Sequence, residues 1–247
     1  MATIHIRPTA ALAPRVLLPG DPGRALALAR ELLDEPKMSN HHRGLWGYTG
    51  LAKADGEPLG IQSTGMGGPS AAIVLHELIE LGVTRAVRVG SCGALRASLR
   101  FGDLVLAREA IAADGVGARL AGHGRPAARS PTAEPVLAAD AGLTAALEHT
   151  AAARAAGRIV TTDLFYEPGG SGREQRWIDG GAIAVEMEAA ALFAVGARRG
   201  AAVGCLLAVS DVFDSRQVRE HVSDDVLLAA ALRMGAAAVA ALSGERV

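Results

Sequence analysis

Aromatic residues, cysteines and net charge are all scarce in this chain. Aromatic side chains make up 3% of its 247 residues although half are hydrophobic, so the core must consist mainly of Ala, Val and Leu. Lysine and arginine (25) almost balance aspartate and glutamate (26), which argues against nucleic acid or an acidic membrane surface as a partner. The two cysteines, Cys92 and Cys205, form no CxxC pair. We therefore expect no metal site and no disulfide, and a reducing compartment.

A targeting signal and a clear membrane span are missing as well. The N-terminal MATIHIRPTA has no basic region followed by an apolar one, so it does not resemble a signal peptide. The longest apolar segment lies near the C-terminus, and Arg233 interrupts it. We expect this segment to be a packed helix rather than a membrane span, in a cytoplasmic protein.

Short apolar runs that alternate with helical segments predict the fold class. The runs are RVLL, LGIQ, AVRV, LVLA, RIVT, AIAV and CLLAV. Such runs indicate a mixed sheet covered by helices on both faces. We predict an α/β fold, a three-layer sandwich with a central mixed β-sheet flanked by helices, in one domain spanning residues 1–247. Ligands bind beyond the carboxyl ends of such strands, and nearly every predicted strand here ends in Gly, Ser, Arg, Asp or Glu.

Two strand ends combine an arginine with a turn that could bind an anion. Arg24 follows a Pro-Gly-Asp-Pro-Gly turn that begins at residue 19, and Arg88 precedes Gly90 and Ser91. Arginine pairs with phosphate oxygens bidentately, and turn amides complete the shell. The first turn alone could be only a turn, whereas Arg88, inside an apolar strand, must meet a carboxylate or a bound anion. The glycine-rich segment 65–70 is weaker, because close helix–strand packing would also explain it.

The segment AIAVEMEAAALF places two glutamates where a strand gives way to a helix. Glu188 could accept hydrogen bonds from two neighbouring sugar hydroxyls, with Met187 against the ring. Glu186 could be a further acceptor or could steady a neighbour. Capping of the helix N-terminus is the alternative, but it would explain one glutamate and leave the other. We therefore predict a sugar site.

A candidate acid and a pair of aromatic residues complete the set. Asp211 follows Ser210 at the end of an apolar strand, where burial would raise the pKa of a carboxyl and suit it to general acid catalysis; it could instead cap the next segment. Phe165 and Tyr166 could stack on a flat base or pack in the core. An anion, a sugar and a flat base are the parts of a nucleoside phosphorylase site.

Seven segments of the chain match a known family in order and spacing: LPGDPGRA, HRGLWGYTG, STGMGGPSAAIV, RVGSCGA, DLFY, VEMEAAALF and VSD. They resemble the nucleoside phosphorylase family whose bacterial members are hexameric, and within it the purine nucleoside phosphorylases. The resemblance implies reversible phosphorolysis of purine (deoxy)ribonucleosides to the free base and (deoxy)ribose 1-phosphate, with inorganic phosphate as co-substrate and no cofactor or metal. It implies phosphate binding by Gly20, Arg24, Arg43, Arg88 and Ser91; ribose binding by His5, Glu186, Met187 and Glu188; base binding by Cys92, Gly93, Phe165, Val185 and Ser210; and proton transfer by Asp211 with Arg219.

The resemblance also implies an assembly. His5 and Arg43 would reach in from a neighbouring subunit, so that the active unit is a dimer and the homo-oligomer a trimer of dimers. An arginine on a lid helix often assists the acid in this family; Arg219 is the better counterpart and Arg216 the other.

Three alternatives remain open at this point. Uridine phosphorylases lack the acid and read uracil with a Gln and an Arg after the Phe-Tyr pair; Gln175 and Arg173 follow it here, but at another spacing, which favours purines. A nucleosidase of the methylthioadenosine/adenosylhomocysteine type would use water and would not need three arginines. A nucleoside-binding protein without catalysis would bind its ligand without turnover.

Overall fold

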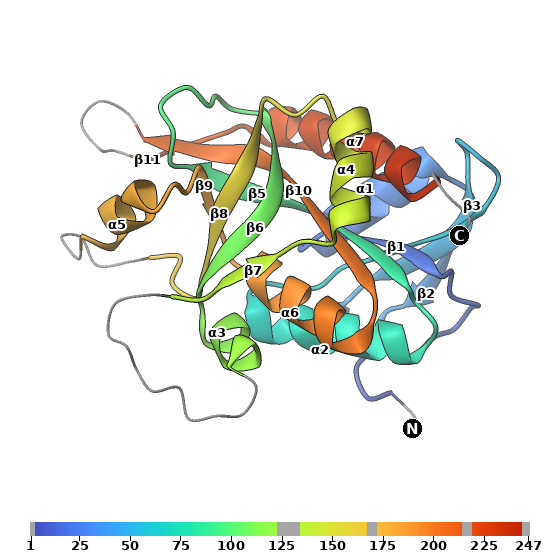
Figure 1. The fold of residues 1–247 in the computed structure, drawn as a ribbon. Helices are drawn as coiled ribbons and strands as arrows, with labels where there is room; N and C mark the ends of the chain where they lie inside the picture. The colour runs from blue at the N-terminus through green and yellow to red at the C-terminus, as the bar shows by residue number, and fades with distance from the viewer. Residues whose placement is uncertain (1–2, 123–133, 167–171, 214–218, 244–247) are drawn as a thin grey trace.

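The computed structural model describes residues 3–122, 134–166, 172–213 and 219–243 (Figure 1). The strands are β1 (Arg15–Leu18), β2 (Leu33–Asn40), β3 (Gly47–Ala52), β4 (Pro58–Gln62), β5 (Arg85–Ala94), β6 (Leu104–Ala113), β7 (Val136–Ala138), β8 (Ala155–Thr162), β9 (Ala184–Glu186), β10 (Ala202–Phe213) and β11 (Arg219–His221). The helices are α1 (Pro22–Leu32), α2 (Gly68–Glu80), α3 (Gly115–Ala121), α4 (Ala141–Thr150), α5 (Arg173–Asp179), α6 (Ala189–Arg199) and α7 (Asp224–Ser243), with a 3-10 turn at His42–Gly44.

The strands form one mixed sheet in the order β11-β10-β6-β8-β9-β5-β1-β4-β3-β2, with β7 paired to β6. Strand β10 also pairs with β5 in parallel, so β10, β6, β8, β9 and β5 close into a ring. The prediction of a mixed sheet flanked by helices is therefore confirmed. The closure was not predicted, because it depends on β10 pairing along both of its edges rather than on any local pattern.

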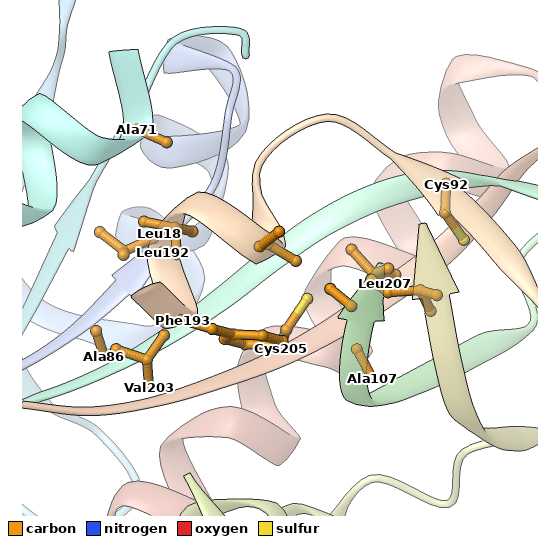
Figure 2. Close-up of a cluster of buried hydrophobic side chains, with 14 of the residues drawn as sticks. Leu18, Ala71, Ala86, Cys92, Ala107, Leu192, Phe193, Val203, Cys205 and Leu207 are labelled. Atoms are coloured by element: carbon orange, nitrogen blue, oxygen red, sulfur yellow. The ribbon is translucent and has the colours of Figure 1, made fainter. Parts of the chain in front are cut away.

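Alternation along the central strands divides the core into two layers. Ala86 and Cys92 of β5 belong to a cluster with α2 and α6, whereas Val87 and Val89 belong to a cluster with α1, α4 and α7. Figure 1 shows these two groups of helices on opposite faces of the sheet. Figure 2 shows the first cluster, in which small and medium side chains fill the space between sheet and helices. The core of Ala, Val and Leu expected from the composition is confirmed.

The apolar C-terminal segment forms α7, which packs against α1, α4 and β10. Helix α7 is long and apolar enough to cross a membrane by length and composition alone, and half of its most apolar stretch is buried within the protein. Buried residues at Ala231, Met234 and Ala238 place this helix in the second core cluster. The segment is thus a packed helix, as predicted.

Candidate functional site

A cavity of about 810 Å³ opens where the turn after β1, the ends of β9 and β10, and helix α5 meet beside β5. Most of the predicted site residues line it together. They are Gly20, Arg24, Arg88, Ser91, Cys92, Gly93, Phe165, Val185, Glu186, Met187, Glu188, Ser210 and Asp211. These residues come from five separate segments of the chain, so their convergence is a property of the fold rather than of any one motif.

At one end of the cavity, Arg88 lies between two carboxylates. Its Nε is 2.9 Å from Oε2 of Glu186, and its Nη2 contacts Oε2 of Glu188. The three side chains are 4%, 0% and 7% exposed, respectively. Burial lowers the pKa of Arg88, but the two carboxylates together raise it by more than burial lowers it, so the net shift is upward. Arg88 therefore remains charged inside the protein.

One donor of this guanidinium is left over. Nη1 of Arg88 is buried and has no hydrogen-bond partner among the residues that the structure describes. The guanidinium folds over Gly90, where an added Cβ would lie 2.7 Å from Cζ and Nη2 of Arg88. Only glycine fits beneath it. An unsatisfied buried donor is costly, so a ligand that bonded to Nη1 would stabilise the site.

Arg24 brings a second positive charge to the same end. Asp21 caps α1, and its Oδ2 accepts a hydrogen bond of 2.7 Å from the backbone N–H of Arg24, which places Arg24 in the first helical turn. Burial lowers the pKa of Arg24, Asp21 raises it, and the nearby charge of Arg88 lowers it again, for a net downward shift. Two neighbouring guanidinium groups at a helix N-terminus favour an anion between them.

The two glutamates after β9 have different surroundings. Glu186 accepts hydrogen bonds from the backbone N–H groups of Glu188 (2.9 Å) and Ala189 (3.0 Å), so it caps α6. Thr161 also donates to it, at 2.5 Å. Burial raises the pKa of Glu186 against the opposing charge of Arg88. With no exposed surface, its side chain fits the alternative that it steadies a neighbour, and capping is its second role.

Glu188 is the glutamate that reaches the cavity with accessible surface. Its Oε1 accepts a 2.6 Å hydrogen bond from the backbone N–H of Gly67, in the glycine-rich segment before α2. Gly67 has φ of +86°, a left-handed conformation that favours glycine. The segment thus uses this N–H to hold Glu188, a use that its sequence did not reveal.

The other end of the cavity is marked by Asp211, which pairs with Gly93 of β5, further along that strand than Arg88, and whose side chain is 6% exposed. Ser210 donates a 2.8 Å hydrogen bond to Oδ2 of Asp211. Strand β11 returns antiparallel to β10 and places His221 opposite Asp211. Nδ1 of His221 contacts Oδ1 of Asp211, although the imidazole is 63% exposed. Sequence reasoning missed His221, because nothing local marks a three-residue strand.

The segment after Asp211 differs from the lid helix that we expected. Arg219 lies in strand β11 with its backbone opposite Phe213, so the prediction of a helix at this residue is wrong. The physical reason is that β10 continues to Phe213 and offers its edge to the returning chain. Arg216 lies outside the described residues.

The two aromatic residues that we predicted to face a base are not in the core. Phe165 is 43% exposed and lines the cavity, and its ring meets that of Tyr166 edge to face at 5.0 Å. Cys92 lies deeper, 3% exposed, and burial raises the pKa of its thiol. The core-packing alternative for the Phe-Tyr pair is therefore excluded, and Cys92 offers a neutral apolar surface.

Helix α5 closes one wall with residues that we did not predict to line the site, Trp177 among them. Gln175 also lines it, but its Nε2 donates to Oδ1 of Asp179, one turn along the same helix, at 2.8 Å. Arg173 stacks over the ring of Trp177 at 5.2 Å. This Gln and Arg thus have partners on their own helix.

His5 and Arg43 do not line the cavity. Nδ1 of His5 is 2.7 Å from Oε1 of Glu77. The two carboxylate oxygens of Glu77 also accept hydrogen bonds from the backbone N–H groups of Ile4, His5 and Ile6. Arg43 is exposed, with φ of +58°. Within the described ranges, no group of three or more His, Cys, Asp or Glu side chains is arranged to hold a metal ion.

Comparison with known proteins adds an independent finding. A family model described as the phosphorylase superfamily matches residues 14–243. A DeoD-type purine nucleoside phosphorylase of Geobacillus kaustophilus is 38% identical over 95% of this chain and 100% of its own length. DeoD-type purine nucleoside phosphorylases of Oceanobacillus iheyensis (37%, over 81% of this chain and 83% of the relative) and Clostridium beijerinckii (37%, over 87% and 89%) are also similar to it.

Proposed function

The chain belongs to the phosphorylase superfamily, and from this premise we propose that it is a purine nucleoside phosphorylase. It converts a purine nucleoside and inorganic phosphate reversibly into the free base and ribose 1-phosphate. The observation that carries the proposal is that two arginines, Glu188 and Asp211 line one cavity, with Glu188 in contact with Arg88 and Asp211 further along the sheet. The relatives' names agree with it.

Phosphate is proposed to bind between Arg24 and Arg88, with Gly20 and Ser91 beside them. Support comes from the free donor at Nη1 of Arg88 and from the N-terminus of α1, which faces the same cavity. The anion would satisfy that donor and relieve the repulsion between the two guanidinium groups. Held on one side of the sugar, it stabilises the positive charge that develops there and then bonds to the anomeric carbon.

The sugar is proposed to lie over Met187, with its hydroxyls on Glu188. Glu186 then serves the sugar indirectly, by holding Arg88 and the start of α6. The base lies against Phe165, Val185, Cys92 and Gly93. As the glycosidic bond breaks, its electron pair moves into the purine, and Asp211 gives a proton to N7 of the leaving base. Arg219 remains the candidate assistant that the family resemblance implies.

We also propose a cytoplasmic homo-oligomer that acts in purine salvage, assembled as a trimer of dimers. Support comes from His5 and Arg43, which the family resemblance assigns to the site but which lie outside this subunit's own cavity. Each would complete a neighbour's site, Arg43 at the phosphate and His5 at the 5′ end of the sugar.

The experiment that tests the function is base release from inosine, adenosine and uridine, each with and without inorganic phosphate. We expect phosphate-dependent release of hypoxanthine or adenine, together with ribose 1-phosphate, and no release of uracil. Asp211→Asn should slow the reaction about 100-fold or more, since a positioned acid contributes roughly that factor, while nucleoside binding persists.

Three results would contradict the proposal. Release that continues without phosphate would indicate hydrolysis, and the arginines would need another role. Cleavage of uridine alone would make the base-site assignment wrong. Binding of nucleoside with no turnover under any condition would indicate a binding protein.

A further inference from the structure

Asp211 has a partner that the proposed reaction has not used. The contact between Nδ1 of His221 and Oδ1 of Asp211 joins two residues that face each other directly across the β10–β11 pair. Ser210 holds the other carboxyl oxygen. Asp211 is thus fixed from both sides, by a neighbour in its own strand and by a side chain from the returning strand.

The two members of the pair differ sharply in their access to water. The side chain of Asp211 is 6% exposed, whereas that of His221 is 63% exposed. A proton leaving Asp211 for a bound base must be replaced, and bulk water has little access to the buried carboxyl. An imidazole can take a proton at one ring nitrogen from water and release one from the other. The exposed ring in contact with a buried acid has the form of such a relay.

We propose that His221 is a positioning residue for Asp211 and returns to it the proton that the leaving base removes. This proposal rests on the function proposed above. In the forward reaction the bond from the anomeric carbon to N9 breaks, a phosphate oxygen bonds to that carbon, and Asp211 protonates N7. The Nδ1 proton of the imidazolium then moves to Oδ1 of Asp211, and His221 is reprotonated through water by the proton that the phosphate loses as it becomes a monoester. With this proton the cycle needs no other reactant.

An arginine could hold Asp211 in place but could not return a proton to it. The guanidinium keeps its proton under all protein conditions, so Arg219 could support Asp211 only by charge. The distinction between His221 and Arg219 is therefore chemical and can be measured.

The experiment compares His221→Asn with the wild-type enzyme on two substrates, inosine and 7-methylinosine. Asparagine keeps a donor near the position of Nδ1 but cannot relay a proton. The base of 7-methylinosine is already positively charged and leaves without protonation at N7. We expect kcat for inosine to fall about 10- to 100-fold, with KM for phosphate within about twofold and with the rate on 7-methylinosine unchanged. Added imidazole should restore part of the rate of His221→Ala on inosine.

The matched control is Glu220→Gln, at the neighbouring exposed position of β11, which should leave both rates unchanged. Equal losses on both substrates would mean a structural role for His221 and would overturn the proposal. So would an unchanged rate on inosine, or a selective loss of inosine cleavage in Arg219→Ala instead. If the wild-type enzyme released no purine base from either substrate with phosphate, the proposed function itself would be wrong, which separates the two failures.

Discussion

The two ends of the cavity hold their charged groups in opposite ways. At the proposed phosphate end, Arg88, Glu186 and Glu188 are almost completely buried and contact one another, with backbone N–H groups satisfying the carboxylates. At the proposed base end, the buried Asp211 contacts the largely exposed His221. One end is a closed network, and the other is connected to water.

The difference matches what each end must do in the proposed reaction. Phosphate needs charges that are fixed before it arrives, and a buried network cannot reorient during the reaction. Proton transfer needs exchange with solvent, which a fully buried acid could not have. A buried network also links catalysis to stability, because removing one member leaves uncompensated charge. The exposed partner at the base end should be removable with little effect on folding.

The largest expected effect comes from Arg88→Met, which removes the centre of the buried network. Glu186 and Glu188 would remain buried without their cation, and we expect the free energy of unfolding to fall by about 3–5 kcal/mol. Phosphorolysis should be lost. Urea unfolding and phosphate-dependent release of hypoxanthine measure the two effects.

Arg24→Met is the matched comparison for this variant. Arg24 is half-buried and does not share the two glutamates, so its loss should change the free energy of unfolding by no more than about 0.5–1 kcal/mol while KM for phosphate rises at least about tenfold. If the two variants lost equal stability, the network around Arg88 would not be the special feature that the comparison requires.

The sequence predicted residues at both ends of the cavity but not how those residues contact one another. Polar residues within or shortly after apolar runs identified Arg88, Glu188 and Asp211, and all three line one cavity. The predicted end of the strand at Gly90 is wrong, because β5 continues to Ala94. That Glu186 caps α6 and holds Arg88 depends on β5 and β9 lying side by side, which no local pattern encodes.

His221 illustrates what sequence reasoning could not find. The expected lid helix is instead the strand β11, whose three residues carry no measurable periodicity. Its position is decided by the free edge of β10, and therefore by the long-range pairing that closes the sheet. Gly90 is similar: its need for glycine arises from the guanidinium that folds over it.

A second prediction separates the two glutamates. Glu188→Gln should lower kcat/KM for inosine about 10- to 100-fold, since charge-assisted hydrogen bonds to the sugar are worth about 1.5–3 kcal/mol. Glu186→Gln should instead lower the free energy of unfolding by about 1–3 kcal/mol, because the amide places a donor against the N–H groups of α6. It should raise KM for phosphate through Arg88 and leave KM for inosine nearly unchanged.

Substrate-specific KM values and urea unfolding decide between the two roles. An increase in KM for inosine in Glu186→Gln that matched that of Glu188→Gln, with unchanged KM for phosphate, would mean that Glu186 touches the sugar. The two glutamates would then form one sugar site, and Glu186 would not be a residue that holds Arg88 in place for phosphate.

The smallest effect concerns the two cysteines, which report on whether the base end opens. Cys92 lines the cavity near Asp211, and Cys205 lies in the core opposite Arg88 on the paired strand. Burial raises the pKa of both thiols, so little reactive thiolate forms at pH 8. We expect iodoacetamide to modify both at least about tenfold more slowly in the folded protein than in urea. Peptide mass spectrometry resolves the two sites. Faster reaction at Cys92 than at Cys205, suppressed by bound nucleoside, would show that the base end opens to solvent beyond His221, whereas equally slow reaction would confine the solvent connection to that imidazole.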